Sequence, residues 1–378
     1  MSRDFVPFAQ ERVMSKWENV VDYNLGDSGV HPMTTEELVD DPKFIEELLS
    51  TGLYHPPANG NTELRQHIAA LYPGATPDNV LVTSGAAQAN FTSLWTLLEP
   101  GDEIVVMLPS YLQIWGIAHN FRLQVKTFNL EEKLDWAVDL DELHSAVTNK
   151  TKLVAVCNPS NPSGHIMTPE EMDAVVAAAD RVGAWLLADE VYAGTERTTD
   201  DVTPSFWGRY ERALAIGSMS KAYGMPGLRI GWIVAAEDVL EEIWARQEYV
   251  TIGSAMLDNK LAAFALSPEV RPRILARTRD YTRKGYGYFE RWAERHGDLL
   301  TWAPPQAAPI VLVRYDADVN STELCMRLIH EHSVEVVPGD HFGLDGHLRI
   351  SYGLPEDYLL EGLDRVSQVL ARLRRPSV

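Results

Sequence analysis

Helix-like and strand-like hydrophobic patterns alternate along the chain from about residue 60 to residue 235. Residues 62–71 have the spacing of an amphipathic helix, and residues 91–98 are also helical in pattern. Continuous apolar runs of strand length lie at 79–83, 103–107, 153–158, 185–189 and 213–218. Apolar runs without polar alternation are typical of strands buried on both faces of a parallel sheet. We therefore expect an α/β fold, with a doubly wound, mainly parallel sheet and helices on both of its faces.

One helix start is marked by its capping residues. Thr168 stands at the N-cap position, Pro169 at the first helical position and Glu171 at the third. An N-cap hydroxyl and a carboxylate three residues later can each accept a hydrogen bond from the other residue's backbone amide. The pattern predicts a helix from this point to about Arg181.

The pattern changes after residue 237, where long helices predominate. Helices are expected at 239–249, 270–295 and 356–374, with strands near 310–315 and 334–337. Long helices gathered on a small sheet predict a second, smaller α+β domain to which the N-terminal residues contribute. The expected division is a large domain over 45–265 and a small domain formed by 1–44 and 266–378.

The composition of the 378 residues is that of a globular protein with a large core, since 45% are hydrophobic and 23% charged. The formal net charge of −21 argues against nucleic acid and anionic membranes as partners. No apolar segment is long enough to span a membrane, and the N-terminus lacks the apolar core of a signal peptide. Cys157 and Cys325 provide neither a disulfide framework nor metal-ligand spacing. We therefore expect a cytoplasmic protein without a metal site.

A single lysine, Lys221, lies between small hydroxyl residues, and Arg229 follows eight positions later. A lysine desolvated among other cationic groups becomes a nucleophile that forms imines with carbonyl compounds. Ser218 and Arg229 offer a hydroxyl donor and a planar guanidinium, which together suit a phosphate. This combination suggests pyridoxal 5'-phosphate (PLP) held as a Schiff base. Taken alone, the segment also fits a solvated loop lysine near a structural arginine.

The ends of two predicted strands carry further candidate residues. Gly85, Ala86 and Ala87 follow a strand and open a helix, where free backbone amides favour a phosphate. Tyr111 lies just past the next strand, where its ring can stack on an aromatic cofactor. Each feature also has an ordinary structural explanation: a strand-to-helix turn for the glycine, and core packing for the tyrosine.

Two more strand ends carry polar residues that are costly to bury. Asn161 stands in a segment with two Asn-Pro pairs, and proline holds the preceding residue out of helical conformation. Asp189 closes an apolar strand, and Tyr192 follows three residues later. A buried aspartate needs a cation or hydrogen-bond donors, and the protonated ring nitrogen of PLP is such a cation. Asn161 and Tyr192 can donate to the phenolate oxygen of the same ring. The structural alternatives are a Pro-Gly turn and an N-capping aspartate.

A strand late in the chain carries one arginine, Arg349, between Leu348 and Ile350. Its planar guanidinium suits two-point binding of a substrate α-carboxylate. The alternative is an arginine on the solvent face of that strand.

The order and spacing of these features resemble fold-type I PLP enzymes of the class I/II aminotransferase family, over about residues 23–370. The resemblance implies that Lys221 carries the cofactor as a Schiff base, and that Asp189 pairs with its ring nitrogen. It also implies the remaining contacts: Tyr111 on the ring, Asn161 and Tyr192 at the phenolate oxygen, Arg349 at the substrate carboxylate, and Gly85, Ala86, Ala87, Ser218 and Arg229 at the phosphate.

The resemblance further implies the reaction and the assembly. An amino group moves between an amino acid and a 2-oxo acid, with Lys221 as the general base for the Cα proton. Catalysis is expected of Lys221, Asp189 and Tyr192. Tyr54 resembles the tyrosine that reaches the phosphate in the neighbouring subunit, so we expect a homodimer with shared active sites.

A loop near the N-terminus departs from the commoner family pattern. From residue 24 to residue 32 it reads NLGDSGVHP, and its SGVH portion is similar to the loop of capreomycidine synthase and related cyclases of hydroxylated arginine. Those enzymes lose a β- or γ-leaving group before ring closure. The alternative function is therefore elimination or cyclisation of a hydroxylated, arginine-like amino acid, in which His31 is a substrate contact or an acid. Gly29 and Asn161 are further candidate substrate contacts. His31 also fits a simple turn before Pro32.

Overall fold

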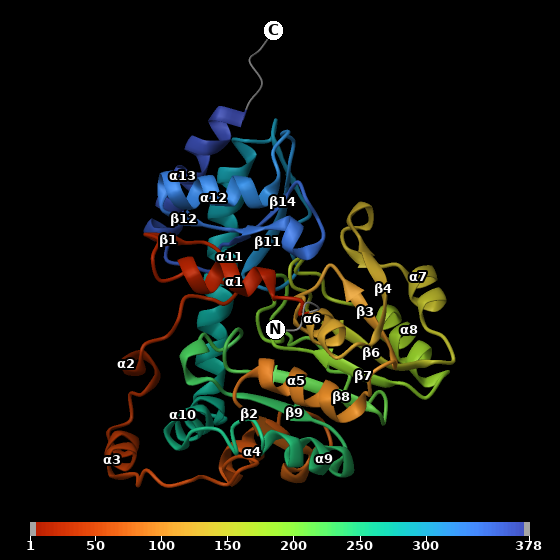
Figure 1. The fold of residues 1–378 in the computed structure, drawn as a ribbon. Helices are drawn as coiled ribbons and strands as arrows, with labels where there is room; N and C mark the ends of the chain where they lie inside the picture. Colours follow the sequence, from red (N-terminus) through yellow and green to blue (C-terminus); the bar gives the residue numbers. More distant parts are fainter. Residues whose placement is uncertain (1–4, 374–378) are drawn as a thin grey trace.

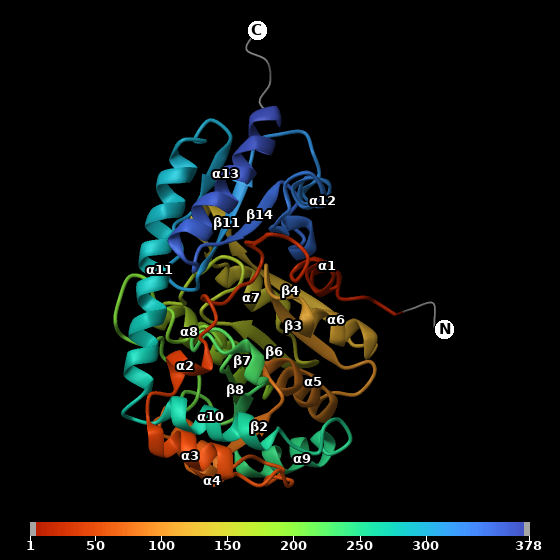
Figure 2. The ribbon, with the colours of Figure 1, turned by 90° about the vertical axis from the view of Figure 1, so that its left-hand side faces the viewer.

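The structure is a computed structural model that describes residues 5–373. An eight-stranded sheet with its helices forms the lower part of the molecule in Figure 1, and a four-stranded sheet lies above it. The helix α11 (Arg271–Glu294) runs alongside both regions (Figure 2). No helix of residues 5–373 is long and apolar enough to cross a membrane.

The large sheet has the strand order β2-β9-β8-β7-β6-β3-β4-β5. Strands β4, β3, β6, β7 and β8 pair in parallel, whereas β9 and β5 are antiparallel to their neighbours. The strands are β2 (Val80–Thr83), β3 (Glu103–Leu108), β4 (Gln124–Glu131), β5 (Ala137–Val138), β6 (Thr151–Cys157), β7 (Trp185–Asp189), β8 (Ala213–Ser218) and β9 (Gly231–Val234). This confirms the expected mainly parallel α/β sheet.

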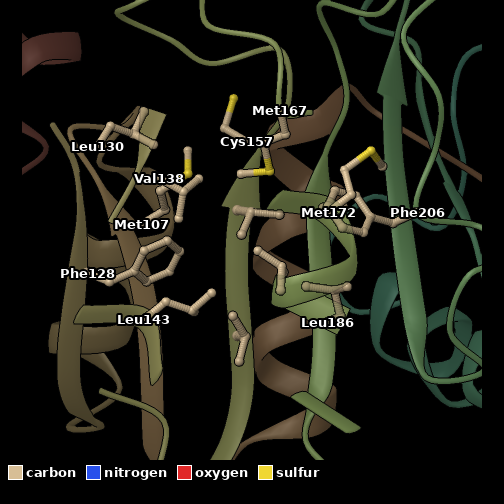
Figure 3. Close-up of a cluster of buried hydrophobic side chains, with 14 of the residues drawn as sticks. Met107, Phe128, Leu130, Val138, Leu143, Cys157, Met167, Met172, Leu186 and Phe206 are labelled. Atoms are coloured by element: carbon tan, nitrogen blue, oxygen red, sulfur yellow. The ribbon is translucent and has the colours of Figure 1, made fainter. Parts of the chain in front are cut away.

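Alternate residues of the central strands point to opposite faces of this sheet, as the two-residue period of a strand requires. On β6, Val154 and Val156 join one buried cluster, and Leu153 and Ala155 join another. Figure 3 shows part of the first cluster, with Phe128 and Leu186. The first face is covered by α7 (Leu140–Ala146) and α8 (Pro169–Asp180), and the second by α5 (Ala86–Leu97), α6 (Gln113–Asn120) and α9 (Glu237–Gln247). Both faces are therefore shielded from water, which explains the unalternated apolar runs.

The predicted helix start at Thr168 is confirmed. The Thr168 hydroxyl accepts from the amide of Glu171 at 3.2 Å, and the Glu171 carboxylate accepts from the amide of Thr168 at 2.7 Å. Helix α8 ends at Asp180, with Arg181 as its C-cap. The same carboxylate accepts from the amide of Val138 at 2.6 Å, so the cap also ties this helix to β5.

The smaller sheet is antiparallel, with the order β10-β11-β14-β13. Its strands are β10 (Leu300–Trp302), β11 (Ile310–Tyr315), β13 (Val337–Pro338) and β14 (His347–Ser351). The strand expected over 334–337 is two short strands, because Val334–Glu335 (β12) pairs with Tyr23–Asn24 (β1) while Val337–Pro338 pairs with β14. Helices α11, α12 (Ser321–His332) and α13 (Glu356–Leu373) pack on this part, and the expected helix end at residue 374 lies outside the described residues.

The N-terminal segment passes between the two regions. Helix α1 (Ala9–Trp17) lies between the small sheet and α6 in Figure 1. Leu25 packs in the core of the small sheet, whereas Leu38 and Val39 pack with α4 (Thr62–Ala69) and α10 (Met256–Leu266) beside the large one. The short helices α2 (Thr35–Leu38) and α3 (Pro42–Ser50) lie in this stretch. The domain boundaries expected at residues 44 and 265 stay a prediction.

Candidate active site

A cavity of about 380 Å³ lies where the parallel strands of the large sheet end. Its floor comes from residues that follow β2, β3, β6, β7 and β8, and its opposite wall comes from α1 and the loop after β1. The carboxyl ends of parallel strands meet at one edge of a sheet, which is the usual place for ligand sites in α/β folds. The sequence-predicted residues that line it are Ala86, Ala87, Tyr111, Asn161, Asp189, Tyr192, Ser218, Lys221 and Arg229.

Lys221 follows β8 and reaches across the cavity to the loop after β1. Its Nζ lies 3.5 Å from the Oδ1 atom of Asp27, and its side chain is about one quarter exposed. Burial by itself would raise the pKa of Asp27, but the charge of Lys221, the amide of Gly29 and the charge of Arg349 outweigh it and lower that pKa. Asp27 is therefore an anion that holds the lysine amine within the cavity.

Asp189 is the last residue of β7 and is buried. Its carboxylate accepts only long hydrogen bonds, from the amide of Val191 at 3.3 Å and from Nδ2 of Asn90 at 3.4 Å. Burial raises the pKa of Asp189 to about 6, despite these donors and the charge of Lys221. A carboxylate so weakly satisfied at the floor of a cavity favours a cationic N–H from a ligand.

Three buried side chains form a chain of contacts beside Asp189. Nδ2 of Asn161 donates to the Tyr192 hydroxyl at 3.2 Å, and Nη1 of Arg349 donates to Oδ1 of Asn161 at 3.1 Å. Arg349 also donates to the carbonyl of Gly26, and its side chain is fully buried. The structure thus excludes a solvent-facing Arg349, and it places the guanidinium behind Asn161 rather than in the cavity lining. Its capture of a substrate carboxylate stays a prediction.

The start of α5 provides an anion cradle. Gly85 is the N-cap with φ 82°, a left-handed conformation that glycine adopts without strain, and Ala86 and Ala87 begin the helix with free amides. A Cβ on Gly85 would stand 2.4 Å from Nη2 of Arg229, so the missing side chain is what lets this guanidinium approach the turn. Ser218 lies on the same wall, and its hydroxyl accepts from the amide of Ser220 at 2.9 Å.

Tyr111 closes the side of the cavity next to α1. Its hydroxyl donates to Oε1 of Glu11 at 2.7 Å, and its ring packs edge-on against Phe8 with centroids 4.9 Å apart. Burial, and then the charge of Glu11, raise the pKa of Tyr111 well above its ordinary value. The tyrosine is therefore both a cavity wall and the contact that holds α1 in place.

Besides Gly85 and Arg349, three predicted residues are not part of the cavity lining. Gly29 lies over the lysine, since a Cβ there would stand 3.2 Å from the carbonyl of Ser220. His31 packs on Tyr281 with ring centroids 5.9 Å apart. Tyr54 is 66% exposed on the molecular surface. Their substrate and cofactor roles stay predictions.

Several lining residues were not found from the sequence: Gln10, Glu11, Met14, Glu18, Asp27, Ser28, Asn90, Gln113 and Ser220. Those on α1 had no signal, because nothing in the sequence says that the first helix folds back over a sheet formed much later. Asp27 lies within the unusual loop at residues 24–32, which was expected to contact the substrate, so its carboxylate could have been identified as a candidate.

Comparison with known proteins agrees with this geometry. A model of the family described as aminotransferase class I and II matches residues 35–366. Capreomycidine synthase from Streptomyces vinaceus is 31% identical over 362 residues, covering 93% of this chain and 91% of that protein. A solved PLP-dependent aminotransferase from Streptococcus suis has a TM-score of 0.92 at 29% identity, covering 100% of both chains. The solved PLP-dependent cyclase OrfR has a TM-score of 0.89 at 26% identity, covering 98% of this chain and 99% of that one.

The fold and the cavity define a PLP-dependent enzyme of fold type I. The chain belongs to the class I and II aminotransferase family.

The residues present fit PLP. The weakly satisfied Asp189 matches a protonated ring nitrogen, and the cradle at Gly85 with Arg229 matches a phosphate. Lys221 lines the same cavity, and its side chain carries the kind of amine that the cofactor aldehyde requires.

Proposed function

We propose that the protein is an aminotransferase that moves an amino group between an amino acid and a 2-oxo acid, with Lys221 as the covalent anchor of the cofactor. The observation that carries this proposal is the presence of Lys221 and the buried Asp189 in one cavity, beside an anion cradle. Neither residue is explained by packing alone, because both are ionisable groups with few partners.

When bound, PLP supplies an electron-accepting ring that stabilises the negative charge left at the substrate Cα. Asp189 holds the ring nitrogen in its protonated, accepting form. Lys221, once its amine is free, would take the Cα proton and deliver it to the carbon on the other side of the imine nitrogen. Asp27, 3.5 Å from Nζ, orients the lysine amine for both transfers.

The remaining residues position the reactants. Asn161 and Tyr192 hold the oxygen of the cofactor ring, and Tyr111 covers its face. Arg349 binds the substrate α-carboxylate once Asn161 no longer occupies its Nη1 donor. Ser218, Arg229 and the amides of Ala86 and Ala87 hold the phosphate.

Elimination or cyclisation of a hydroxylated, arginine-like amino acid is the second candidate. It is favoured by the similarity to capreomycidine synthase and to the cyclase OrfR. Both reactions begin with the same proton removal by Lys221, so they differ only in what happens to the electrons. Transfer needs a 2-oxo acid acceptor, whereas cyclisation releases a leaving group and needs none.

We propose a homodimer as the working assembly. Large apolar side chains are exposed on one surface, with Trp95 and Tyr249 in edge contact at 6.4 Å between ring centroids and Val250 and Ile252 following. Gly253, which follows Ile252 in the chain, packs against Ala58, so the segment that carries Tyr249 contacts the segment that follows Tyr54. We call Trp95, Tyr249, Val250 and Ile252 the apolar patch; a second copy seated on it would cover these side chains.

A cytoplasmic location is supported by Cys157 and Cys325, which are both buried free thiols.

The test is a screen of the holoprotein with nitrogen-labelled amino acids, hydroxyarginines included, against several 2-oxo acids. Transamination predicts label in a new amino acid, whereas cyclisation predicts a product lighter by its leaving group without any acceptor. The Lys221→Ala variant, with its fold checked by circular dichroism, should do neither. A protein that takes up no PLP, and in which borohydride fixes nothing on Lys221, would refute both candidates.

A further inference from the structure

Asn90 lies on α5, one helical turn after Ala86 of the anion cradle, and lines the cavity together with Asp189. Its side chain is 2% exposed. The helix packs against the large sheet through apolar residues, and Leu94 belongs to the cluster that also contains Leu187 of β7. An asparagine on such a buried face costs free energy, because its amide loses the hydrogen bonds that water would provide. Packing therefore does not explain this residue.

The two ends of the Asn90 amide are not equally satisfied. Its nitrogen Nδ2 donates to Oε1 of Gln113 at 3.1 Å and to Oδ2 of Asp189 at 3.4 Å. Its carbonyl oxygen is buried and has no hydrogen-bond partner within residues 5–373. A buried acceptor without a donor is costly. The contacts thus serve the Asp189 carboxylate at the expense of the asparagine, which indicates that the amide nitrogen is the functional part of this side chain.

The neighbours of Asn90 set the orientation of its amide. Nε2 of Gln113 donates to the carbonyl of Ala87 at 2.9 Å. A backbone carbonyl can only accept, so it fixes which end of the Gln113 amide points toward it. The other end, Oε1, then faces Asn90 and accepts from it. The Asn90 nitrogen is therefore directed at two acceptors, whereas the reversed amide would bring its oxygen against the Asp189 carboxylate.

The titratable groups around Asp189 come from the ends of β6, β7 and β8 and from the segment before α6. They are Cys157, Glu190, Tyr192, Lys221 and Tyr111. Burial raises the pKa of Cys157, Tyr192 and Tyr111 above the ordinary values, so all three are neutral at neutral pH. Burial also raises the pKa of Glu190 to about 8, so this carboxyl group is largely neutral as well. Among these groups, Lys221 is therefore the cation that favours the Asp189 anion.

Asn90 acts in the same direction as that cation. Burial raises the pKa of Asp189 to about 6, whereas the amide of Val191, the side chain of Asn90 and the charge of Lys221 each lower it. Without Asn90, the folded protein would keep the Asp189 proton up to a higher pH. A protonated carboxyl group is a poor partner for a cationic N–H, so the loss would be felt by the cofactor.

We propose that Asn90 is a positioning residue for the cofactor: its amide nitrogen, oriented by Gln113, holds the Asp189 carboxylate in place and favours its charged form. The inference rests on the proposed PLP chemistry and adds a residue that the sequence did not indicate. Asn90 stands on the helix that begins at the anion cradle. One rigid element therefore sets both the phosphate site and the partner of the ring nitrogen.

The test is the pH dependence of PLP affinity, measured on the full-length chain by fluorescence titration. PLP binding needs the Asp189 anion, so the affinity falls as pH decreases through the pKa of this carboxyl group. Asn90→Leu removes the donor at similar volume. The variant should bind PLP at least about threefold more weakly than the wild type at about pH 5.5, and within about 1.5-fold of it at about pH 8. The titrations of the cofactor itself are common to both proteins and cancel in this ratio.

Ser93→Ala is the matched control, because it also removes a buried polar group of α5, one without a hydrogen-bond partner in the described part of the chain. Its PLP affinity should match that of the wild type at both pH values. Gln113→Leu keeps Asn90 but removes the contact that orients it, so it should show a smaller loss, about twofold, at low pH only. Gln113 is only partly buried, so this variant tests the inference even if Asn90→Leu does not fold.

An equal loss of affinity at both pH values in Asn90→Leu would overturn the inference, because it would indicate a structural defect alone. An unchanged affinity at low pH in either Asn90→Leu or Gln113→Leu would also overturn it. Each of these results leaves the proposed function standing, since PLP still binds. The proposed function fails separately, if the wild type takes up no PLP and borohydride attaches no cofactor to Lys221.

Discussion

At the scale of single residues, the active site is defined by ionisable groups placed where they are poorly solvated. Asp189 ends a strand whose other residues are apolar, and its two hydrogen bonds are 3.3 and 3.4 Å long. In the cofactor-free protein this buried carboxylate destabilises the folded state. With a protonated ring nitrogen beside it, the same carboxylate becomes a binding determinant.

Asp189→Asn should stabilise the cofactor-free protein at neutral pH and abolish most of its activity. The folded-state pKa of about 6 lies above the ordinary 3.8, so folding binds a proton more tightly and wild-type stability falls as pH rises between these values. Above pH 6 the cost is about 3 kcal/mol at most, and asparagine removes it.

Thermal unfolding of both cofactor-free proteins at pH 4 and pH 7 is the measurement. The gain for the variant should appear only at pH 7, and transfer activity with PLP should fall at least about a hundredfold. Glu190, whose pKa burial raises to about 8, titrates in both proteins, so its contribution cancels in the difference apart from the smaller part that the Asp189 charge adds. A gain of equal size at both pH values would contradict this account.

At the scale of elements, strand ends and helix starts position the chemistry. The first turn of α5 faces the segment after β8 because Gly85 has no side chain, and β9 packs so closely that a Cβ on Gly231 would stand 2.5 Å from the amide nitrogen of Ala86. The anion cradle is therefore a property of backbone packing between two elements that are distant in sequence.

Gly85→Ala should weaken PLP binding at least about tenfold, since the new methyl group displaces Arg229 from the phosphate position. Its backbone strain at φ 82° should also cost about 1 kcal/mol of stability. Gly74→Ala is the matched control, because Gly74 has φ 78° and no atom within 4 Å of the added Cβ. Fluorescence titration with PLP and thermal unfolding measure the two effects. Similar PLP affinities in both variants would show that the contact with Arg229 is unimportant.

At the scale of the whole molecule, one chain leaves a large apolar surface open. Tyr249 is 87% exposed and Tyr54 66%, and the Tyr249 ring is in edge contact with Trp95 of α5. An exposed apolar surface on an acidic protein supports the proposed contact between copies.

The wild type should sediment at twice the chain mass of 42.3 kDa, and Tyr249→Asp combined with Ile252→Asp should sediment as the single chain. The two new carboxylates would lose their hydration in an apolar interface without gaining hydrogen-bond or charge partners, so dimerisation should be lost. Leu134→Asp changes an exposed leucine outside the apolar patch and should leave the dimer intact. Only the monomeric double variant should lose activity, because its Tyr54 could no longer reach the cofactor phosphate of a neighbouring subunit. A fully active monomer would contradict the shared-site arrangement.

The amino-acid sequence by itself determined the local features of this protein. The capping pair Thr168 and Glu171, the apolar strands and the residues at their ends follow from short-range rules of hydrogen bonding and periodicity. The sequence also identified three candidate site residues, because each is a polar side chain at or just after the end of an apolar strand: Lys221, Asp189 and Asn161.

Only the tertiary structure decided which distant segments meet. It brought α1 over the cavity, set Asp27 3.5 Å from Lys221 and buried Arg349 behind Asn161. The sequence left the orientation of Arg349 open, because one strand arginine can face either solvent or core. The physical reason is that such contacts join residues 100 to 194 positions apart, whose encounter depends on the packing of both sheets rather than on any local pattern.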